Sequence, residues 1–129
     1  MSIFRRGQRG PGRVTVQEAA ARTGHGDIAD SAGDAVLLDV REPYEWQAGH
    51  APRAVHLSLS ALAAGAGLPS EAQARPLIVI CRSGNRSRQA AELLVARGAQ
   101  AVDVIGGMHD WAGAGLPVVD ARGGNGTIA

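Results

Sequence analysis

Short apolar runs alternate along the chain with segments in which apolar and polar residues share a helical period. The runs span three to five residues each and lie at residues 14–16, 36–40, 54–57, 76–80 and 102–105. This length is typical of strands, and the segments between the runs fit short helices. Such alternation is typical of a parallel sheet with helices on its faces. The pattern therefore predicts an α/β domain with a central, mostly parallel sheet of about five strands.

Helix boundaries carry signals of their own. Thr15 and Glu18 have the spacing of a capping box, in which each residue's side chain binds the other's backbone N–H, so a helix is expected to follow. Pro43 lies where a second helix can begin, because the first turn tolerates proline. A third helix is expected over residues 89–97, with Gly98 as the residue that ends it.

The two ends of the chain depart from this pattern. Residues 1–13 contain four arginines interleaved with glycine and proline, and residues 120–129 contain three glycines. Neither end has an apolar period, so we expect both to be disordered. One domain over residues 14–119 is then predicted, which fits the total length of 129 residues.

Composition and charge limit the classes of function. A net charge of +1 argues against a general nucleic-acid-binding protein, although the arginine-rich leader leaves a weak contact with nucleic acid or an acidic partner open. The single cysteine excludes an internal disulfide. No segment approaches the roughly 20 apolar residues of a membrane span, and the leader lacks the apolar centre of a secretory signal. These features predict a soluble cytoplasmic protein without a membrane partner.

The cysteine lies where a predicted strand meets a predicted helix. Cys81 follows the apolar run 76–80 and precedes the helical run 89–97. The first turn of a helix offers unpaired N–H groups and the positive end of the helix dipole, and both stabilise a thiolate. Three nearby cations add to this effect: Arg82, Arg86 and Arg88. Ligands of parallel sheets bind at the carboxyl ends of the strands, so a reactive sulfur at the mouth of a small pocket is expected here.

The residues that follow the cysteine predict an anion cradle. Gly84 and Asn85 tolerate left-handed backbone angles, so successive N–H groups of the loop can point inward. A buried and inert cysteine is the ordinary alternative, because free cysteine packs like a small apolar residue. The polar, arginine-rich loop argues against that alternative. A dithiol redox role would need a second cysteine, which the chain lacks.

Four separate stretches resemble, in order and spacing, the single-domain rhodanese or sulfurtransferase family. They are residues 37–42 (LLDVRE), 45–54 (EWQAGHAPRA), 81–87 (CRSGNRS) and 106–118 (GGMHDWAGAGLPV). The resemblance covers about residues 14–119 and implies a three-layer α/β/α rhodanese-like domain. Arg53 is a departure, since the family commonly has glycine at that position.

The resemblance implies a thiosulfate sulfurtransferase that works by double displacement. Cys81 would take the sulfane sulfur of thiosulfate or of a persulfide donor, hold it as a persulfide, and pass it to cyanide, a thiol or a protein acceptor. The implied donor-binding residues are those of the loop: Arg82, Ser83, Gly84, Asn85, Arg86 and Ser87. Among them Arg86 and Arg82 would bind the donor's oxygens, and the backbone N–H groups would stabilise the anionic persulfide.

Other polar residues are expected to support the site. Asp39 and Arg41 flank a strand end, where an ion pair would brace the loops. Asp103 lies inside an apolar strand, and the sequence suggests no role for it. The histidines show no metal-ligand spacing, so neither a metal nor another cofactor is expected. Their positions are His25, His50, His56 and His109.

Two other functions compete with sulfur transfer. Cysteine phosphatases and arsenate reductases on a related scaffold also place a thiolate below an anion nest that an arginine closes. The rhodanese-like phosphatases have five residues between these two side chains, whereas four residues separate Cys81 from Arg86. The tighter ring suits a single sulfur better than a phosphoryl group. The second alternative is a sulfur-carrier or regulatory module without turnover.

Overall fold

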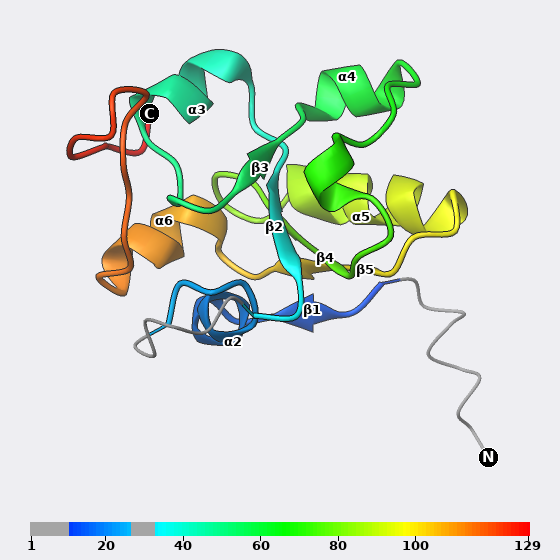
Figure 1. Cartoon of the computed structure of the whole chain (residues 1–129), viewed down its shortest axis with the longest axis horizontal. Helices are drawn as coiled ribbons and strands as arrows, with labels where there is room; N and C mark the ends of the chain where they lie inside the picture. Colours follow the sequence, from blue (N-terminus) through cyan, green and yellow to red (C-terminus); the bar gives the residue numbers. More distant parts are fainter. Residues whose placement is uncertain (1–10, 27–32) are drawn as a thin grey trace.

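The computed structural model describes residues 11–26 and 33–129, and it contains one central sheet (Figure 1). The strands are β1 (Arg13–Val14), β2 (Val36–Asp39), β3 (Val55–His56), β4 (Leu77–Ile80) and β5 (Ala101–Val104). Their order in the sheet is β1-β5-β4-β2-β3, and every neighbouring pair is parallel. The strand that leads into Cys81, β4, is therefore the central one.

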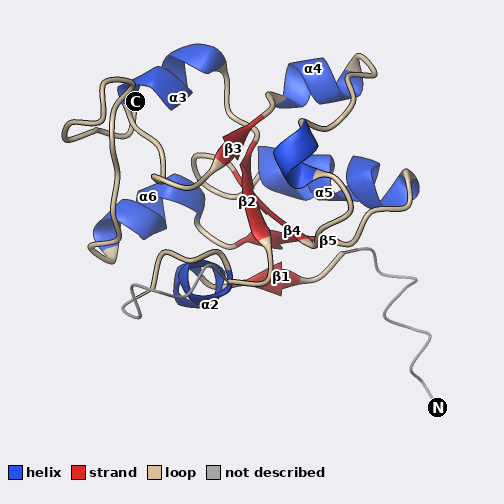
Figure 2. Cartoon of the chain, viewed as in Figure 1, coloured by secondary structure: helices blue, strands red, loops and turns tan. Residues whose placement is uncertain are grey.

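Helices cover both faces of this sheet (Figure 2). They are α2 (Val16–Arg22), α3 (Pro43–Ala48), α4 (Leu59–Ala63), α5 (Arg86–Ala96) and α6 (Gly107–Gly113), with a 3-10 turn η1 (Ser70–Ala72). Because side chains alternate between the two faces of a strand, Leu38 and Val79 pack towards α4 and α5. Leu37 and Ile78 pack on the opposite face, towards α2 and α6. The predicted three-layer α/β/α fold with a parallel sheet is confirmed.

The first strand ends two residues earlier than the apolar run predicts. Thr15 Oγ1 accepts a hydrogen bond from the N–H of Glu18, and Glu18 Oε1 accepts one from the N–H of Thr15, so the capping box is present. Thr15 therefore acts as the N-cap, Val16 begins α2, and the strand ends at Val14 instead of Val16. Arg13, which was assigned to the leader, belongs to β1.

The helix after Cys81 begins earlier than expected. It starts at Arg86 instead of residue 89, because Asn85 already has right-handed angles of φ −95° and ψ −52°. Gly98 follows its end with φ +94°, the left-handed angle predicted for a residue that ends a helix. The loop that surrounds the sulfur is consequently short.

Residues 120–129 follow a defined path, where the sequence predicted disorder. The N–H of Thr127 donates to the carbonyl of Ala48 at 2.9 Å, and Ile128 packs partly buried against the core. Such contacts cannot be predicted from the composition of the segment, because they depend on backbone groups of a distant helix. Residues 1–10 of the predicted leader lie outside the described residues. In the described part of the chain, no helix is long and apolar enough to cross a bilayer.

Candidate active site

Cys81 follows the last residue of β4, at the carboxyl edge of the sheet and directly before the loop that leads to α5. The residue is 1% exposed. One side of it packs in the apolar core with Val40 and Val79. The other side meets polar groups, because the N–H of Gly84 donates to Sγ at 3.1 Å and Ser87 Oγ lies 3.4 Å from Sγ. The sulfur is thus covered by its own loop, whereas the sequence predicted the mouth of a pocket.

The backbone of the loop explains this closure. Gly84 has φ +103°, the left-handed conformation expected for it, and this turns its N–H back towards Sγ of Cys81. Asn85 was expected to be left-handed too, but it has right-handed angles and caps α5. The cradle therefore combines one inward amide, that of Gly84, with the first turn of α5.

A pair of glycines holds α6 against the loop. The N–H of Met108 donates to the carbonyl of Cys81 at 2.7 Å, and the N–H of His109 donates to the carbonyl of Arg82 at 2.9 Å. Gly107 has φ +57°, and a Cβ there would lie 2.4 Å from the carbonyl oxygen of Cys81. Because no side chain fits there, the Gly106–Gly107 stretch allows α6 to fix the backbone that directly follows the cysteine side chain.

Arg86 binds Glu45 of α3 in a two-point contact. Nη1 donates to Oε1 at 2.7 Å and Nη2 donates to Oε2 at 2.9 Å. These hydrogen bonds lower the pKa of the Glu45 carboxyl and raise the pKa of the Arg86 guanidinium. The guanidinium is one-third exposed, while the carboxylate is 3% exposed. Sequence reasoning assigned no role to Glu45, although it begins one of the four stretches that resemble the family and forms a capping box with Glu42.

Three of the other predicted donor-binding side chains lie at the surface, whereas Ser87 is buried against the sulfur. Arg82 Nε donates to the carbonyl oxygen of Ala129 at 2.9 Å, so this arginine contacts the C-terminal segment. Ser83 and Asn85 are exposed. The structure thus gathers the loop residues around Cys81 but directs its two arginines to partners outside the loop. Their contact with a donor stays a prediction.

Asp39 and Arg41 form an ion pair that is completely buried. Arg41 Nε and Nη2 donate to the two carboxylate oxygens of Asp39, with a shortest distance of 2.7 Å. Nη2 of Arg41 also donates to the carbonyl of Gly49 at 2.6 Å. The pair therefore connects the end of β2 to the residue that closes α3, beside the carboxyl end of β4.

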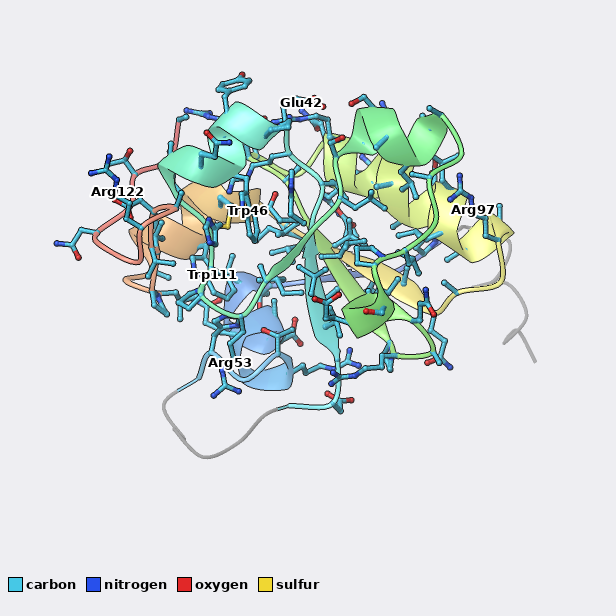
Figure 3. All side chains as sticks on the ribbon, turned by 45° about the horizontal axis from the view of Figure 1, so that its top comes forward. Glu42, Trp46, Arg53, Arg97, Trp111 and Arg122 are labelled. Carbon is cyan, nitrogen blue, oxygen red and sulfur yellow. The ribbon has the colours of Figure 1, made fainter. Side chains whose placement is uncertain are left out.

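Trp46 of α3 (labelled in Figure 3) stacks between two histidines. Its ring centroid is 3.6 Å from that of His50 and 4.9 Å from that of His56. His56 Nε2 also lies 2.7 Å from the carbonyl oxygen of Arg41. The stack therefore packs α3 against the Asp39–Arg41 pair. Among the described residues, no group of His, Cys, Asp and Glu side chains could hold a metal ion.

A charged residue inside β5 reaches the site through Ser87. Ser87 Oγ donates to Asp103 Oδ2 at 2.8 Å. Arg13 of β1 binds both oxygens of Asp103, at 3.0 Å from Nε and 3.2 Å from Nη2. A chain of hydrogen bonds therefore runs from Cys81 to Arg13. The sequence analysis assigned no role to Asp103 and placed Arg13 in the leader, and the only available signal was a charge within an apolar strand.

The comparison with family models covers Cys81 and the loop around it. The model described as the rhodanese-like domain matches residues 15–114. The chain belongs to the rhodanese-like domain family. The match confirms the resemblance seen in the four sequence stretches.

Solved structures support this placement. A rhodanese-related protein from Thermoplasma volcanium is 36% identical over 67% of this chain and 84% of its own, with a TM-score of 0.60. A thiosulfate sulfurtransferase from Pseudomonas aeruginosa is 18% identical with a TM-score of 0.70, over 99% of this chain and 23% of that one. A Rhodopseudomonas palustris protein of unknown function, described as a possible tyrosine phosphatase, is 23% identical with a TM-score of 0.64, over 89% of both chains. The latter two show a shared fold alone.

Proposed function

We propose that this rhodanese-like domain is a sulfurtransferase that carries sulfane sulfur as a persulfide on Cys81. The observation that supports this function is the N–H of Gly84, which donates to Sγ at 3.1 Å in front of the first turn of α5. An amide aimed at sulfur stabilises negative charge there, both on a thiolate and on a persulfide. An inert core cysteine has no need of such a donor.

The proposed reaction has two displacement steps. The Cys81 thiolate attacks the outer sulfur of thiosulfate, the S–S bond of the donor breaks, and sulfite leaves with the bonding electrons. A cyanide ion or a thiolate then attacks the outer sulfur of the persulfide, and the Cys81 thiolate is the leaving group. The products are thiocyanate or an acceptor persulfide, and no external oxidant or reductant is needed. Ping-pong kinetics follow from this scheme.

The donor has to open the loop to reach the sulfur, because Cys81 is 1% exposed. Two arginines flank the entry. Arg82 holds the carbonyl of Ala129 at the surface, and Arg86 is one-third exposed beside Glu45. We propose that Arg82 exchanges this contact for the charged oxygens of the donor, which form charge-assisted hydrogen bonds with a guanidinium. A compact dianion such as thiosulfate, or a persulfide on glutathione or a protein, fits such a site.

A cysteine phosphatase or arsenate reductase is the main competing function. The four residues between Cys81 and Arg86 favour sulfur over a phosphoryl group, because the cradle they form is small. The steady-state formation of thiocyanate from thiosulfate and cyanide tests the proposal, with Cys81→Ser as the control. We expect turnover in the unchanged protein and none in the variant. Hydrolysis of an aryl phosphate or reduction of arsenate, without thiocyanate, would reverse the ranking.

A further inference from the structure

Four residues from different parts of the chain form one connected path to the sulfur. Sγ of Cys81 lies 3.4 Å from Ser87 Oγ, which donates to Asp103 Oδ2 at 2.8 Å. Arg13 then binds both carboxylate oxygens of Asp103. The Asp103 side chain is 3% exposed, and Ser87 is completely buried. A negative charge is thus held in the core, two hydrogen bonds away from the nucleophile.

Several other charged groups around Cys81 already have partners. Asp39 is bound by Arg41 next to β4, and Glu45 is bound by Arg86. On α6, His109 Nδ1 lies 3.3 Å from Asp110 Oδ1, and in the loop Arg82 donates to a backbone carbonyl.

Arg13 is likewise the charged partner of Asp103. A cavity of about 50 Å³ beside the Arg13–Asp103 pair is also lined by Arg88 and Glu92, whose charges have opposite signs. With Arg13 in place, the charges near Asp103 are balanced. Without Arg13, the carboxylate of Asp103 would oppose any negative charge on the sulfur, and the low polarity of the core would strengthen that opposition.

The single hydroxyl hydrogen of Ser87 links this charge to the sulfur. In the structure it points to Asp103, so Ser87 Oγ offers a lone pair to the S–H group of Cys81. A thiolate or a persulfide needs a donor instead, which requires the hydroxyl hydrogen to turn from Asp103 to the sulfur. That turn leaves Asp103 hydrogen-bonded only because Arg13 already binds both of its oxygens.

We propose that Arg13 and Asp103 are positioning residues that set the ionisation of Cys81 through Ser87. Nη2 of Arg13 also donates to the carbonyl of Gly84 at 3.0 Å, so the same guanidinium holds the loop whose amide meets the sulfur. The importance of this arrangement for turnover rests on the proposed sulfur transfer. Its effect on the thiol does not, and this allows a separate test.

The test is the rate of alkylation of Cys81 by iodoacetamide as a function of pH. A change in loop opening multiplies the alkylation rate by the same factor at every pH. A change in a nearby charge instead moves the pH at which the rate is half of its maximum. We expect Arg13→Gln to move that pH upward by about one unit, a roughly tenfold slower reaction at neutral pH. Asp103→Asn should move it downward, since Arg13 then remains as an unbalanced cation. The double variant R13Q/D103N should return close to the unchanged protein.

Two further variants separate charge from general damage. Arg13→Lys keeps the charge and should retain most of the unchanged profile. Arg22→Gln is the matched control, because Arg22 binds Asp34 on the surface through the same two atoms, at 3.3 Å from Nε and 3.2 Å from Nη2. It should leave the profile unchanged.

Several results would overturn the inference. A normal profile for Arg13→Gln would do so, as would a double variant as displaced as Arg13→Gln, which would assign the effect to the Gly84 contact alone. If Arg13→Gln does not fold, Asp103→Asn decides, and an unchanged or upward displacement rejects the proposal. Sulfur loading from thiosulfate is measured in parallel on the unchanged protein. If loading fails there, the proposed function fails, while the alkylation profiles still decide the roles of Arg13 and Asp103.

Discussion

Arg86 and Glu45 hold each other through two hydrogen bonds of 2.7 and 2.9 Å, and this contact joins α5 to α3 beside the sulfur. The carboxylate is buried and the guanidinium is one-third exposed. A guanidinium is planar and rigid, so a carboxylate on one edge also fixes the direction of its remaining N–H groups. Glu45 therefore orients the arginine that we expect to meet the donor.

Replacement of Arg86 by alanine should reduce kcat/KM for thiosulfate by roughly tenfold to a hundredfold, the loss expected for one charge-assisted contact. Steady-state thiocyanate kinetics measure this. Arg97→Ala is the control, because Arg97 is the C-cap residue of the same helix but donates to the carbonyl oxygens of Leu62 and Ala66. Figure 3 shows Arg97 at the opposite end of the molecule from Arg122 in the C-terminal segment. Equal losses in both variants would remove Arg86 from the site.

The sequence predicted those features of the structure that depend on interactions between neighbouring residues. The capping box of Thr15 and Glu18 involves neighbouring residues, and the position of Cys81 after an apolar run follows from strand length. The contacts between distant segments could not be predicted. Arg13 and Asp103 are 90 positions apart, and no period or motif connects them. The same reason hid Glu45 and the binding of Arg82 by the C-terminal segment.

The burial of the sulfur was missed for a related reason. The arginine-rich loop after Cys81 indicated an open anion site, because charged side chains usually face the solvent. In the structure the side chain of Arg82 points away to Ala129, while the backbone of Gly84 covers the sulfur. Side-chain composition gave no information on the direction of the loop backbone.

Gly107→Ala should destabilise the protein. The new Cβ would lie 2.4 Å from the carbonyl of Cys81, and φ is +57°, so both sterics and backbone conformation oppose it. We expect a loss of about 1–3 kcal/mol in the free energy of unfolding, measured with urea. Gly113→Ala in the same helix is the control, because its Cβ would meet nothing within 4 Å. Similar stability of the two variants would contradict the proposed packing of α6 on the loop.

His25 should make the protein sensitive to mild acid. It is 8% exposed, its Nε2 accepts the N–H of Arg53 at 2.9 Å, and its Nδ1 lies 2.8 Å from Thr23 Oγ1. Burial, and then the charge of Arg53, lowers the pKa of His25 to about 4 from its usual 6.5. The unfolded chain therefore binds a proton before the folded protein does. Its contribution to stability is complete above pH 6.5 and is lost as the pH falls from there to about 4.

The size of this loss can be measured by urea unfolding at pH 7.5 and pH 4.5. A difference of roughly 2–3 kcal/mol is expected from this group. His25→Gln should lose stability at the higher pH and show a smaller difference between the two. His109→Gln, at a side chain that is 72% exposed, should keep the full difference. An unchanged pH difference in His25→Gln would show that the folded protein accommodates the protonated ring.

The formation of a persulfide on Cys81 is tested most directly by intact-mass spectrometry after treatment with thiosulfate. The unchanged protein should gain the mass of one sulfur atom, cyanide should remove it, and Cys81→Ser should gain nothing. An unchanged mass after treatment, or a sulfur gain that persists in Cys81→Ser, would contradict the account.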